Sequence, residues 1–252
     1  ERFRESALGT VGRNWLDFGK RRHGVAVCVG VYLSVLLPPH LKGMAERIPE
    51  DMMKAAVFHD PLKMEVRDDI AEPVLKSGEV LVGVKACGIC GSDLHLYRAN
   101  AHRGSGVLRI NEQGLEIPGH EYSGVILQVG EGVSGFAPGD RVVGVTGGGA
   151  FAERVPVPAN PFQLVHMPEG LSFEEAATAE PMADALQMVR LADVKPNDNL
   201  VVFGVGIIGL VVIQALRALA KPVGKLIAID VSAPRLAMAS EVGETETINA
   251  RE

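Results

Sequence analysis

Cysteine is scarce in this chain, and so is tryptophan. Only three cysteines and one tryptophan occur in 252 residues. Small secreted domains held together by disulfide bonds are far richer in cysteine, so that class is excluded and a reducing, cytoplasmic setting is expected. Positive charge is not in excess either, because 25 Lys and Arg face 31 Asp and Glu, which gives a net charge of −6. This balance gives no reason to expect a nucleic acid or an anionic membrane as a partner.

A hydrophobic run long enough for a membrane span is also missing. Val25–Leu37 follows a basic cluster at 20–22, but it is shorter than the about 20 apolar residues that a span requires. It lies in residues 1–52, whose composition differs from the rest. We interpret 1–52 as a leader outside the folded part, upstream of a true start at Met52 or Met53, in preference to an anchor. Since the chain begins at Glu1, we expect a fragment truncated at both ends.

From Met53 onward the chain changes to short apolar runs separated by Gly and Pro. Glu79–Lys85 alternates most clearly between apolar and polar residues, as a half-buried strand does. Many short strands with turn signals between them predict a sandwich or a partly open barrel. The predicted strands are 54–58, 63–67, 79–85, 122–129, 140–145, 152–157 and 163–165. The polar, Gly-containing stretch 98–116 is predicted to be a loop.

The stretch Ala86–Tyr97 carries unusually dense chemistry. Within nine positions it holds two thiols, a hydroxyl, a carboxylate and an imidazole, at Cys87, Cys90, Ser92, Asp93 and His95. A solvated loop rarely concentrates so many metal-binding and proton-carrying groups. From this stretch alone a redox C-x-x-C motif or a buried thiol pair stays open, because that spacing is common.

Two further segments carry acidic or imidazole groups in unusual places. His120 and Glu121 adjoin the predicted strand 122–129, thirty residues after Cys90, which weakens the interpretation of a surface pair. Ser172 to Glu175 forms a capping-box pattern that opens a helix. Pro181 must break or kink the helix that follows, so Glu180 beside it is either a ligand or a solvated charge at a helix end.

The last part of the chain contains a dinucleotide-binding fingerprint. The predicted strand 199–203 leads into G-V-G-I-I-G at 204–209, a helix follows, and a second strand ends at Asp230, 21 residues after the last glycine. Such glycines let the backbone approach a pyrophosphate at the helix N-terminus. Asp230 would accept hydrogen bonds from the adenosine ribose and repel the extra phosphate of NADP. The pattern therefore favours NAD, with Arg235 as an opposing charge.

Five motifs occur together in one order: G-I-C-G-S-D-L-H (88–95), G-H-E (119–121), P-G-D-R-V (138–142), E-P (180–181) and G-V-G-I-I-G (204–209). Together they resemble the medium-chain dehydrogenase/reductase family, in particular its zinc-dependent alcohol and polyol (sorbitol-dehydrogenase-like) members. The resemblance runs from Met53 to the end. It implies an α/β plus β fold: a GroES-like, partly open β-barrel catalytic domain at 53–185 and an incomplete Rossmann domain, a doubly wound parallel sheet, at 186–252.

The resemblance also implies a role for each matching position. It places one catalytic zinc ion on Cys90, His120 and Glu180, with Glu121 as an alternate ligand. Cys87 has no catalytic task, and Asp93 orients the ligand histidine, as zinc-bound imidazoles require. Ser92 starts removal of the alcohol proton, and His95 is a later station of that relay. The expected NAD contacts are Gly204, Gly206, Gly209, Asp230 and Arg235.

Three departures from the family pattern qualify these roles. Between Asp140 and Ala159 there is no cysteine, so the structural zinc of many relatives is expected to be absent. The nucleotide domain is expected to stop after two strands instead of about six. At about 30 residues per β-α unit, on the order of 100 residues would be missing. The leader 1–52 has no counterpart in the family.

The leading hypothesis is a cytoplasmic, zinc- and NAD-dependent dehydrogenase of a secondary alcohol or polyol, whose parent is a homodimer or homotetramer. One alternative is a zinc-free reductase of the quinone-reductase type from the same superfamily. The other is an inactive truncated product that binds zinc at most. We expect the chain by itself to be inactive and poorly stable, because an unfinished parallel sheet exposes its edges.

Overall fold

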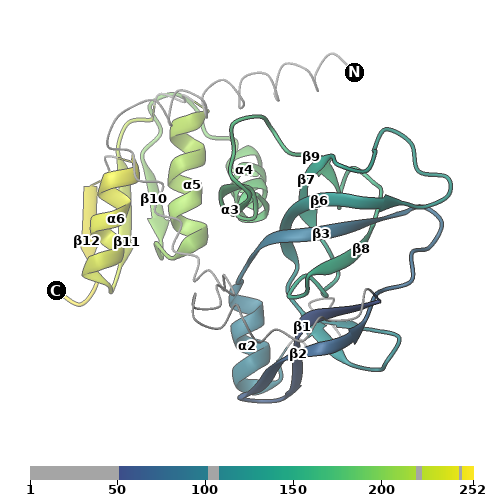
Figure 1. The fold of residues 1–252 in the computed structure, drawn as a ribbon. Helices are drawn as coiled ribbons and strands as arrows, with labels where there is room; N and C mark the ends of the chain where they lie inside the picture. The colour runs from purple at the N-terminus through teal and green to yellow at the C-terminus, as the bar shows by residue number, and fades with distance from the viewer. Residues whose placement is uncertain (1–50, 102–107, 220–222, 244–245) are drawn as a thin grey trace, which may run out of the picture. The chain divides into compact units, whose positions relative to one another are not determined.

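The computed structural model describes residues 51–101, 108–219, 223–243 and 246–252 (Figure 1). The interpretation of the leader therefore lies outside the described residues, except for its last two positions. The chain divides into two compact units between Ala179 and Glu180. The boundary predicted between 185 and 186 falls inside helix α4 (Ala179–Leu191). None of the described helices is long and apolar enough to cross a membrane.

The first unit is built from two antiparallel sheets. One has the order β2-β1-β5-β4 and the other the order β8-β3-β6-β7-β9. The first sheet consists of β1 (Met52–Asp60), β2 (Lys63–Ala71), β4 (Leu108–Ile110) and β5 (Glu116–Pro118). The second consists of β3 (Glu79–Gly88), β6 (Glu121–Val129), β7 (Arg141–Val145), β8 (Arg154–Pro158) and β9 (Val165–His166). The predicted strands are thus present except for 163–165, which overlaps β9 only at Val165, and the antiparallel sheets agree with the expected GroES-like architecture.

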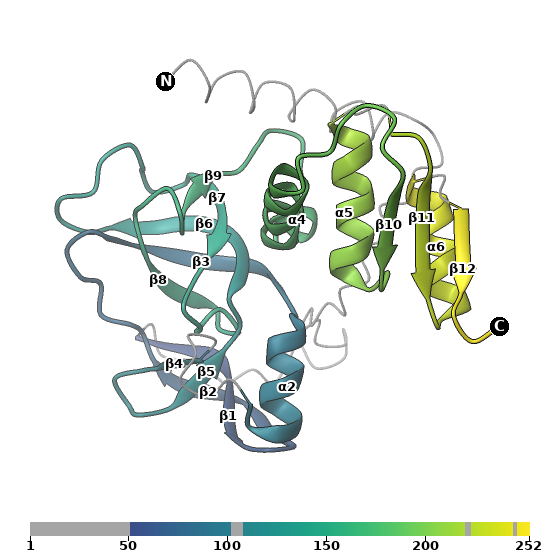
Figure 2. The same ribbon diagram turned by 180° about the vertical axis from the view of Figure 1, so that it is seen from behind.

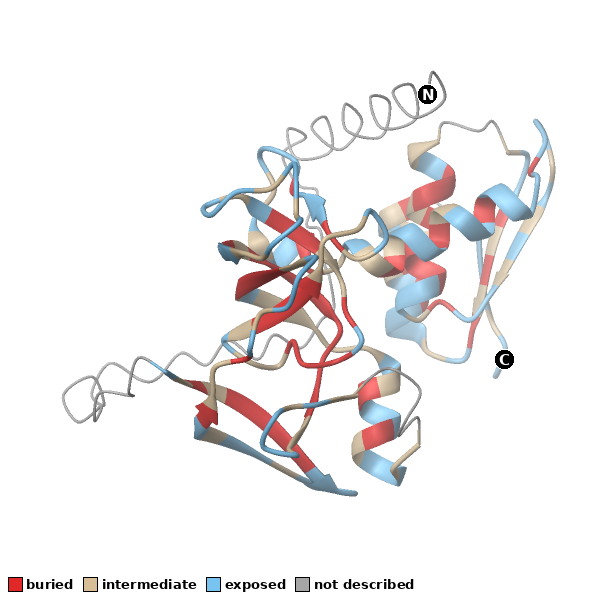
Figure 3. Ribbon diagram, turned by 90° about the vertical axis from the view of Figure 1, so that its right-hand side faces the viewer, coloured by how far each residue is buried: buried red, intermediate tan, exposed pale blue. Residues whose placement is uncertain are grey.

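Apolar side chains of the second sheet form the core of this unit. Val80, Val82, Tyr122 and Ile126 are almost completely buried and pack in one cluster. Figure 3 shows buried residues along the strands of this unit. The hydroxyl of Tyr122 donates to the carbonyl oxygen of Gln163 at 2.8 Å, so its burial leaves no polar group unpaired. In the middle of this sheet both faces are covered, since β3 and β6 are each buried at four consecutive positions.

Two elements of the first unit differ from the sequence-based expectation. The stretch 98–116, predicted to be a loop, contains β4 and the start of β5, so that prediction is wrong for these residues. Helix α2 (Gly91–Ala99) was not anticipated. Short strands such as β4 are stabilised by their neighbours in the sheet and leave little trace in local composition.

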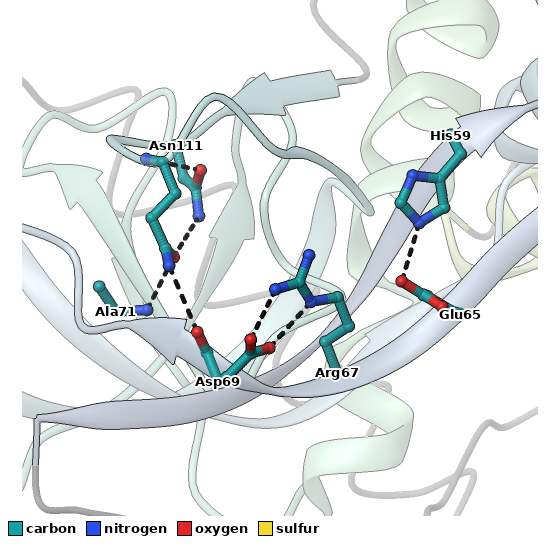
Figure 4. Close-up of polar contacts among 7 residues, drawn as sticks. His59, Glu65, Arg67, Asp69, Ala71 and Asn111 are labelled. Atoms are coloured by element: carbon teal, nitrogen blue, oxygen red, sulfur yellow. Dashed lines mark hydrogen bonds and ion pairs between the residues drawn. The ribbon is translucent and has the colours of Figure 1, made fainter.

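Polar contacts fix the segment that leads into β5 (Figure 4). The side-chain oxygen of Gln113 accepts a hydrogen bond from the Ala71 backbone N–H at 2.9 Å. The Asn111 side chain in turn accepts from the backbone N–H groups of Gln113 and Leu115, at 3.0 and 2.9 Å. These bonds tie the turn before β5 to the end of β2. They hold the chain on its way to the junction between β5 and β6.

The break expected at Pro181 lies instead at 177–178, between helices α3 (Phe173–Ala176) and α4. The predicted capping box is present, because Ser172 Oγ accepts from the Glu175 N–H at 3.1 Å and Glu175 Oε2 accepts from the Ser172 N–H at 2.8 Å. The helix ends at Ala176, and α4 starts at Ala179. Pro181 thus lies in the first turn of α4, where its missing N–H has no intrahelical partner to lose.

The second unit contains a parallel sheet in the order β10-β11-β12 with helices α5 and α6 packed on it (Figure 2). Its elements are β10 (Leu200–Phe203), α5 (Ile207–Ala218), β11 (Leu226–Asp230), α6 (Ala233–Gly243) and β12 (Glu246–Asn249). One core cluster joins both helices to the sheet residues Leu226 and Ala228. The expectation of two strands is wrong, since β12 pairs with β11 as a third. Its polar sequence E-T-I-N shows no strand pattern.

Candidate metal centre

The centre is assembled from two places in the chain, and the first is the start of α2. Cys90 is the N-terminal capping residue of that helix and is half-buried. Its backbone N–H donates to Asp93 Oδ2 at 2.9 Å. A carboxylate at the third helical position satisfies an N–H that the helix itself leaves unpaired and complements the helix dipole. This local bond fixes Asp93 one turn from the thiol.

The second place is the junction between β5 and β6, where His120 lies. Gly119 before it has φ +88°, and a Cβ atom there would lie 2.4 Å from the ring of Phe151. Only glycine therefore fits this tight turn. The carbonyl oxygen of His120 accepts from the Thr146 N–H at 2.9 Å. The antiparallel pairing of β3 with β6 places Glu121 opposite Gly88, so the two parts of the centre meet.

Cys90, His120 and Glu121 form a group with metal-binding geometry. Each offers one ligand atom, and these atoms lie within 4.8 Å of one another. His120 and Glu121 are buried, with 8% and 5% of their surfaces exposed. Thiolate sulfur, imidazole nitrogen and carboxylate oxygen are the donor types that zinc accepts.

Asp93 lies on the other side of the His120 ring. Its Oδ1 is 3.7 Å from His120 Nδ1, whereas His120 Nε2 is 3.9 Å from Glu121 Oε1. Neither Asp93 Oδ1 nor His120 Nδ1 has a hydrogen-bond partner among the described residues, although both are buried. A metal ion on Nε2 would make Nδ1–H the donor and Asp93 the acceptor, which is the usual arrangement around zinc-bound histidine. The residues present therefore fit a zinc ion.

The charges in the group suit a cation. Burial acts to lower the pKa of His120, but the nearby Asp93 carboxylate and Cys90 thiol outweigh it and raise this pKa to about 10. His120 in turn lowers the pKa of the Cys90 thiol. The imidazolium thus supplies a positive charge between the Asp93 carboxylate and the Cys90 sulfur. The pKa of Cys87 is raised well above its usual range by burial, so Cys87 stays a thiol beside the core.

Zinc binding by the metal-free chain should release protons. His120 must be neutral to bind a metal, and its raised pKa means that it carries a proton at neutral pH. We expect release of about one proton from this residue, and weaker binding as the pH falls. Calorimetric titration with Zn²⁺ in buffers of different ionisation enthalpy measures the number released. Binding without a buffer-dependent enthalpy would contradict this assignment of charge.

Three further residues, Ser92, His95 and Glu180, are predicted to belong to the metal site. Ser92 Oγ is buried and has no hydrogen-bond partner among the described residues, and His95 lies one turn further along α2 with an exposed side chain. Residues three apart share a helix face, so a proton could pass from Ser92 to the solvent by way of His95. Glu180 lies at the start of α4, in the second unit. Its role as a ligand stays a prediction.

The loop between β10 and α5 has the shape that the glycine fingerprint requires. Gly204 has φ +79°, and a Cβ atom on Gly209 would lie 2.1 Å from the Gly204 carbonyl oxygen, so the helix packs directly on the turn. A Cβ atom on Gly206 would meet nothing within 4 Å. The backbone is therefore open at the first turn of α5, where a pyrophosphate could approach.

Asp230 ends β11 beside this loop and is 7% exposed. Its Oδ2 accepts from the Val205 N–H at 2.8 Å, and its Oδ1 accepts from the Ser232 N–H at 2.9 Å. The bond from Val205 is the main cause of a lowered pKa, so the carboxylate is ionised at neutral pH. Arg235 Nη1 lies 3.9 Å from Oδ2. The carboxylate is thus fixed in orientation, and each oxygen keeps a lone pair for a further donor.

Comparison with known proteins agrees with both units. Residues 76–169 match the family model "Alcohol dehydrogenase GroES-like domain". The chain is 37% identical to (R,R)-butanediol dehydrogenase and 33% identical to sorbitol dehydrogenase, both from Bacillus subtilis, over 76% and 83% of its length. A solved Escherichia coli structure, described as a short chain alcohol dehydrogenase complexed with NADH, superposes with a TM-score of 0.68, at 30% identity over 80% of this chain.

Fold and donor set thus define a GroES-like catalytic domain joined to part of a Rossmann domain. The chain is similar to the medium-chain dehydrogenase/reductase family, with alcohol and polyol dehydrogenases among its relatives. It spans 62% and 64% of the lengths of the two Bacillus subtilis relatives and 64% of the superposed Escherichia coli chain.

Proposed function

We propose that the protein carrying this chain is a zinc-dependent dehydrogenase that transfers a hydride between a secondary alcohol or polyol and NAD. The observation that carries the proposal is the buried group of Cys90, His120 and Glu121, backed by Asp93 at 3.7 Å from the second ring nitrogen of His120. This donor set favours a zinc enzyme over a zinc-free reductase of the quinone-reductase type. It fits a single catalytic ion, and no structural zinc belongs to the proposal.

Cys90, His120 and a glutamate, either Glu180 or Glu121, would hold the ion. When bound, zinc supplies a Lewis acid that polarises the substrate hydroxyl group and makes its proton easier to remove. Asp93 keeps the imidazole of His120 in the orientation and tautomer in which Nε2 is available.

Proton removal is assigned to Ser92 and His95. Ser92 Oγ, buried and without a hydrogen-bond partner among the described residues, would accept the hydroxyl proton as it passes its own proton onward. His95, exposed one turn along α2, would receive that proton and exchange it with solvent. NAD, when bound, would supply the acceptor for the hydride from the alcohol carbon, which balances the two-electron oxidation.

NAD is the proposed cofactor because Asp230 lies where the adenosine ribose is held in such folds. Its ionised carboxylate can accept from ribose hydroxyls, and it would repel the additional phosphate of NADP. Arg235 lies 3.9 Å away and weakens that repulsion. Gly204, Gly206 and Gly209 would line the pyrophosphate.

Relatives named for butanediol and sorbitol support the substrate class, since both compounds carry secondary hydroxyl groups. A cytoplasmic location and a homodimeric or homotetrameric parent belong to the same proposal and rest on the cysteine content and the family resemblance.

The test has two arms. Elemental analysis of the purified chain after dialysis measures bound zinc, with about one ion per chain expected. NADH formation by the protein that contains this chain is then followed with butanediol, sorbitol and a panel of other secondary alcohols. A zinc-free protein would contradict the metal site, and a zinc protein that oxidises none of these alcohols would contradict the dehydrogenase assignment.

A further inference from the structure

The backbone conformation at Gly88, beside the metal centre, is one that does not require glycine. Gly88 ends β3 and is not among the glycines with positive φ, so an L-residue could adopt its conformation. A Cβ atom there would nevertheless lie 2.2 Å from Glu121 Oε2 and 3.2 Å from both Cβ and Cδ of Glu121. These are the three nearest atoms. The absence of a side chain at Gly88 therefore makes room for Glu121, and no other residue comes closer to this position.

The burial of the Glu121 carboxylate in that space costs free energy. Its side chain is 7% exposed, and burial of a carboxylate is unfavourable unless a positive charge or hydrogen bonds compensate for it. Oε2 fills the space over Gly88, while Oε1 faces His120 Nε2 at 3.9 Å. The cross-strand pairing of Gly88 with Glu121 thus turns the carboxylate toward the other two metal-binding side chains.

We propose that Gly88 is a positioning residue of the metal centre. Because Gly88 has no side chain, the Glu121 carboxylate can lie within reach of the ion. The inference rests on the proposed zinc site. It assigns a function to a glycine that carries no donor atom. It also requires Glu121 to contribute to metal affinity in this chain, so that displacement of its carboxylate is detectable in metal binding itself.

The test is a double-mutant cycle between Gly88→Ala and Glu121→Ala in the complete chain. Gly88→Ala should displace the flexible end of Glu121 and weaken Zn²⁺ binding about tenfold, in the range that supporting residues of metal sites show. Glu121→Ala should weaken it to a similar extent. The double variant should bind no more weakly than Glu121→Ala alone, because the carboxylate that Gly88 accommodates is then gone.

The matched control is Gly91→Ala. A Cβ atom on Gly91 would meet nothing within 4 Å, so this change adds the same methyl group three residues away without contact. Zn²⁺ dissociation constants are measured by competition with a chelator. The visible absorption of bound Co²⁺ reports the ligand geometry, which should change in Gly88→Ala and stay unchanged in Gly91→Ala. A merely destabilised fold would not alter the Co²⁺ spectrum of the protein that still binds.

Several results would overturn the inference. Equal zinc affinity and equal Co²⁺ spectra in wild type and Gly88→Ala would do so, as would a full tenfold loss from Gly88→Ala in the Glu121→Ala background. If Gly88→Ala does not fold, recovery of folding in the double variant supports the contact with Glu121, and continued misfolding refutes it. A wild-type chain without zinc refutes the proposed function as well, whereas zinc bound equally by wild type and Gly88→Ala refutes only this inference.

Discussion

Replacement of His120 by alanine is expected to remove zinc from the chain. The variant loses the nitrogen donor of the group Cys90, His120 and Glu121 and removes the ring that Asp93 Oδ1 faces. Loss of a direct ligand should exceed the ten- to hundredfold effect of a supporting residue, so we expect zinc affinity to fall by at least about a hundredfold. Equilibrium dialysis with Zn²⁺ and elemental analysis measure the loss.

His59 provides the matched control, because it is an exposed histidine of the same unit. Its Nε2 is 3.0 Å from Glu65 Oε1 at the surface of the β1–β2 pair (Figure 4). His59→Ala should leave zinc affinity unchanged, since exposed ion pairs contribute little to stability. Retention of wild-type zinc affinity by His120→Ala would show that His120 is not a ligand.

Replacement of Asp230 by alanine is expected to cause the largest loss of NAD binding. The variant removes the acceptor for the Val205 and Ser232 N–H groups and, in the proposed complex, the acceptor for the ribose hydroxyls. Hydrogen bonds to a charged group contribute about 1.5–3 kcal/mol, which corresponds to a roughly ten- to hundredfold weaker NAD affinity. The preference for NAD over NADP should fall as well. Calorimetric titration with each cofactor measures both.

Asp198→Ala is the control for that change. Asp198 also accepts a backbone hydrogen bond, from Lys195 at 2.7 Å, but it precedes β10 and so lies at the end of the strand opposite the glycine loop. It should leave NAD affinity unchanged. NAD affinity equal to wild type in Asp230→Ala would contradict the ribose assignment.

Acid titration gives a second readout for Asp230. Its pKa is lowered in the folded protein, chiefly by the Val205 N–H, so its hydrogen bonds contribute stability above the ordinary carboxyl pKa of about 3.9. That contribution is lost as the pH falls through the lower, folded-state pKa. Asp230→Ala should therefore lose less stability on acidification than wild type does.

Much of the fold was predictable because its signals are local. Runs such as Glu79–Lys85 alternate with period two, and each became a strand. The family and the fold class were predicted correctly from motifs whose order is specific. β4 and β12 were missed, since such short sequences acquire strand structure by pairing with β5 and β11. Helix α2 could have been found, because Cys90 and Asp93 have the spacing of a capping box.

The site was predictable in its residues but not in its contacts. The motifs named Cys90, His120 and Asp93, whose roles stay predictions until metal binding is measured. The sequence places Gly88 and Glu121 33 positions apart and contains no sign that one makes room for the other. That relation depends on the register of β3 against β6, which a one-residue shift would destroy.

The amino-acid sequence by itself thus determined the donor types, the glycine loop and the family resemblance of this chain, because these depend on residue identity and spacing. The tertiary structure decided which donors meet. Antiparallel pairing brings the junction before β6 to the start of α2, and burial there leaves His120 between Asp93 and the thiol of Cys90, with its pKa raised to about 10. Charge and distance in such a group are properties of the packed protein, since they depend on segments that are remote in the sequence and on the exclusion of water.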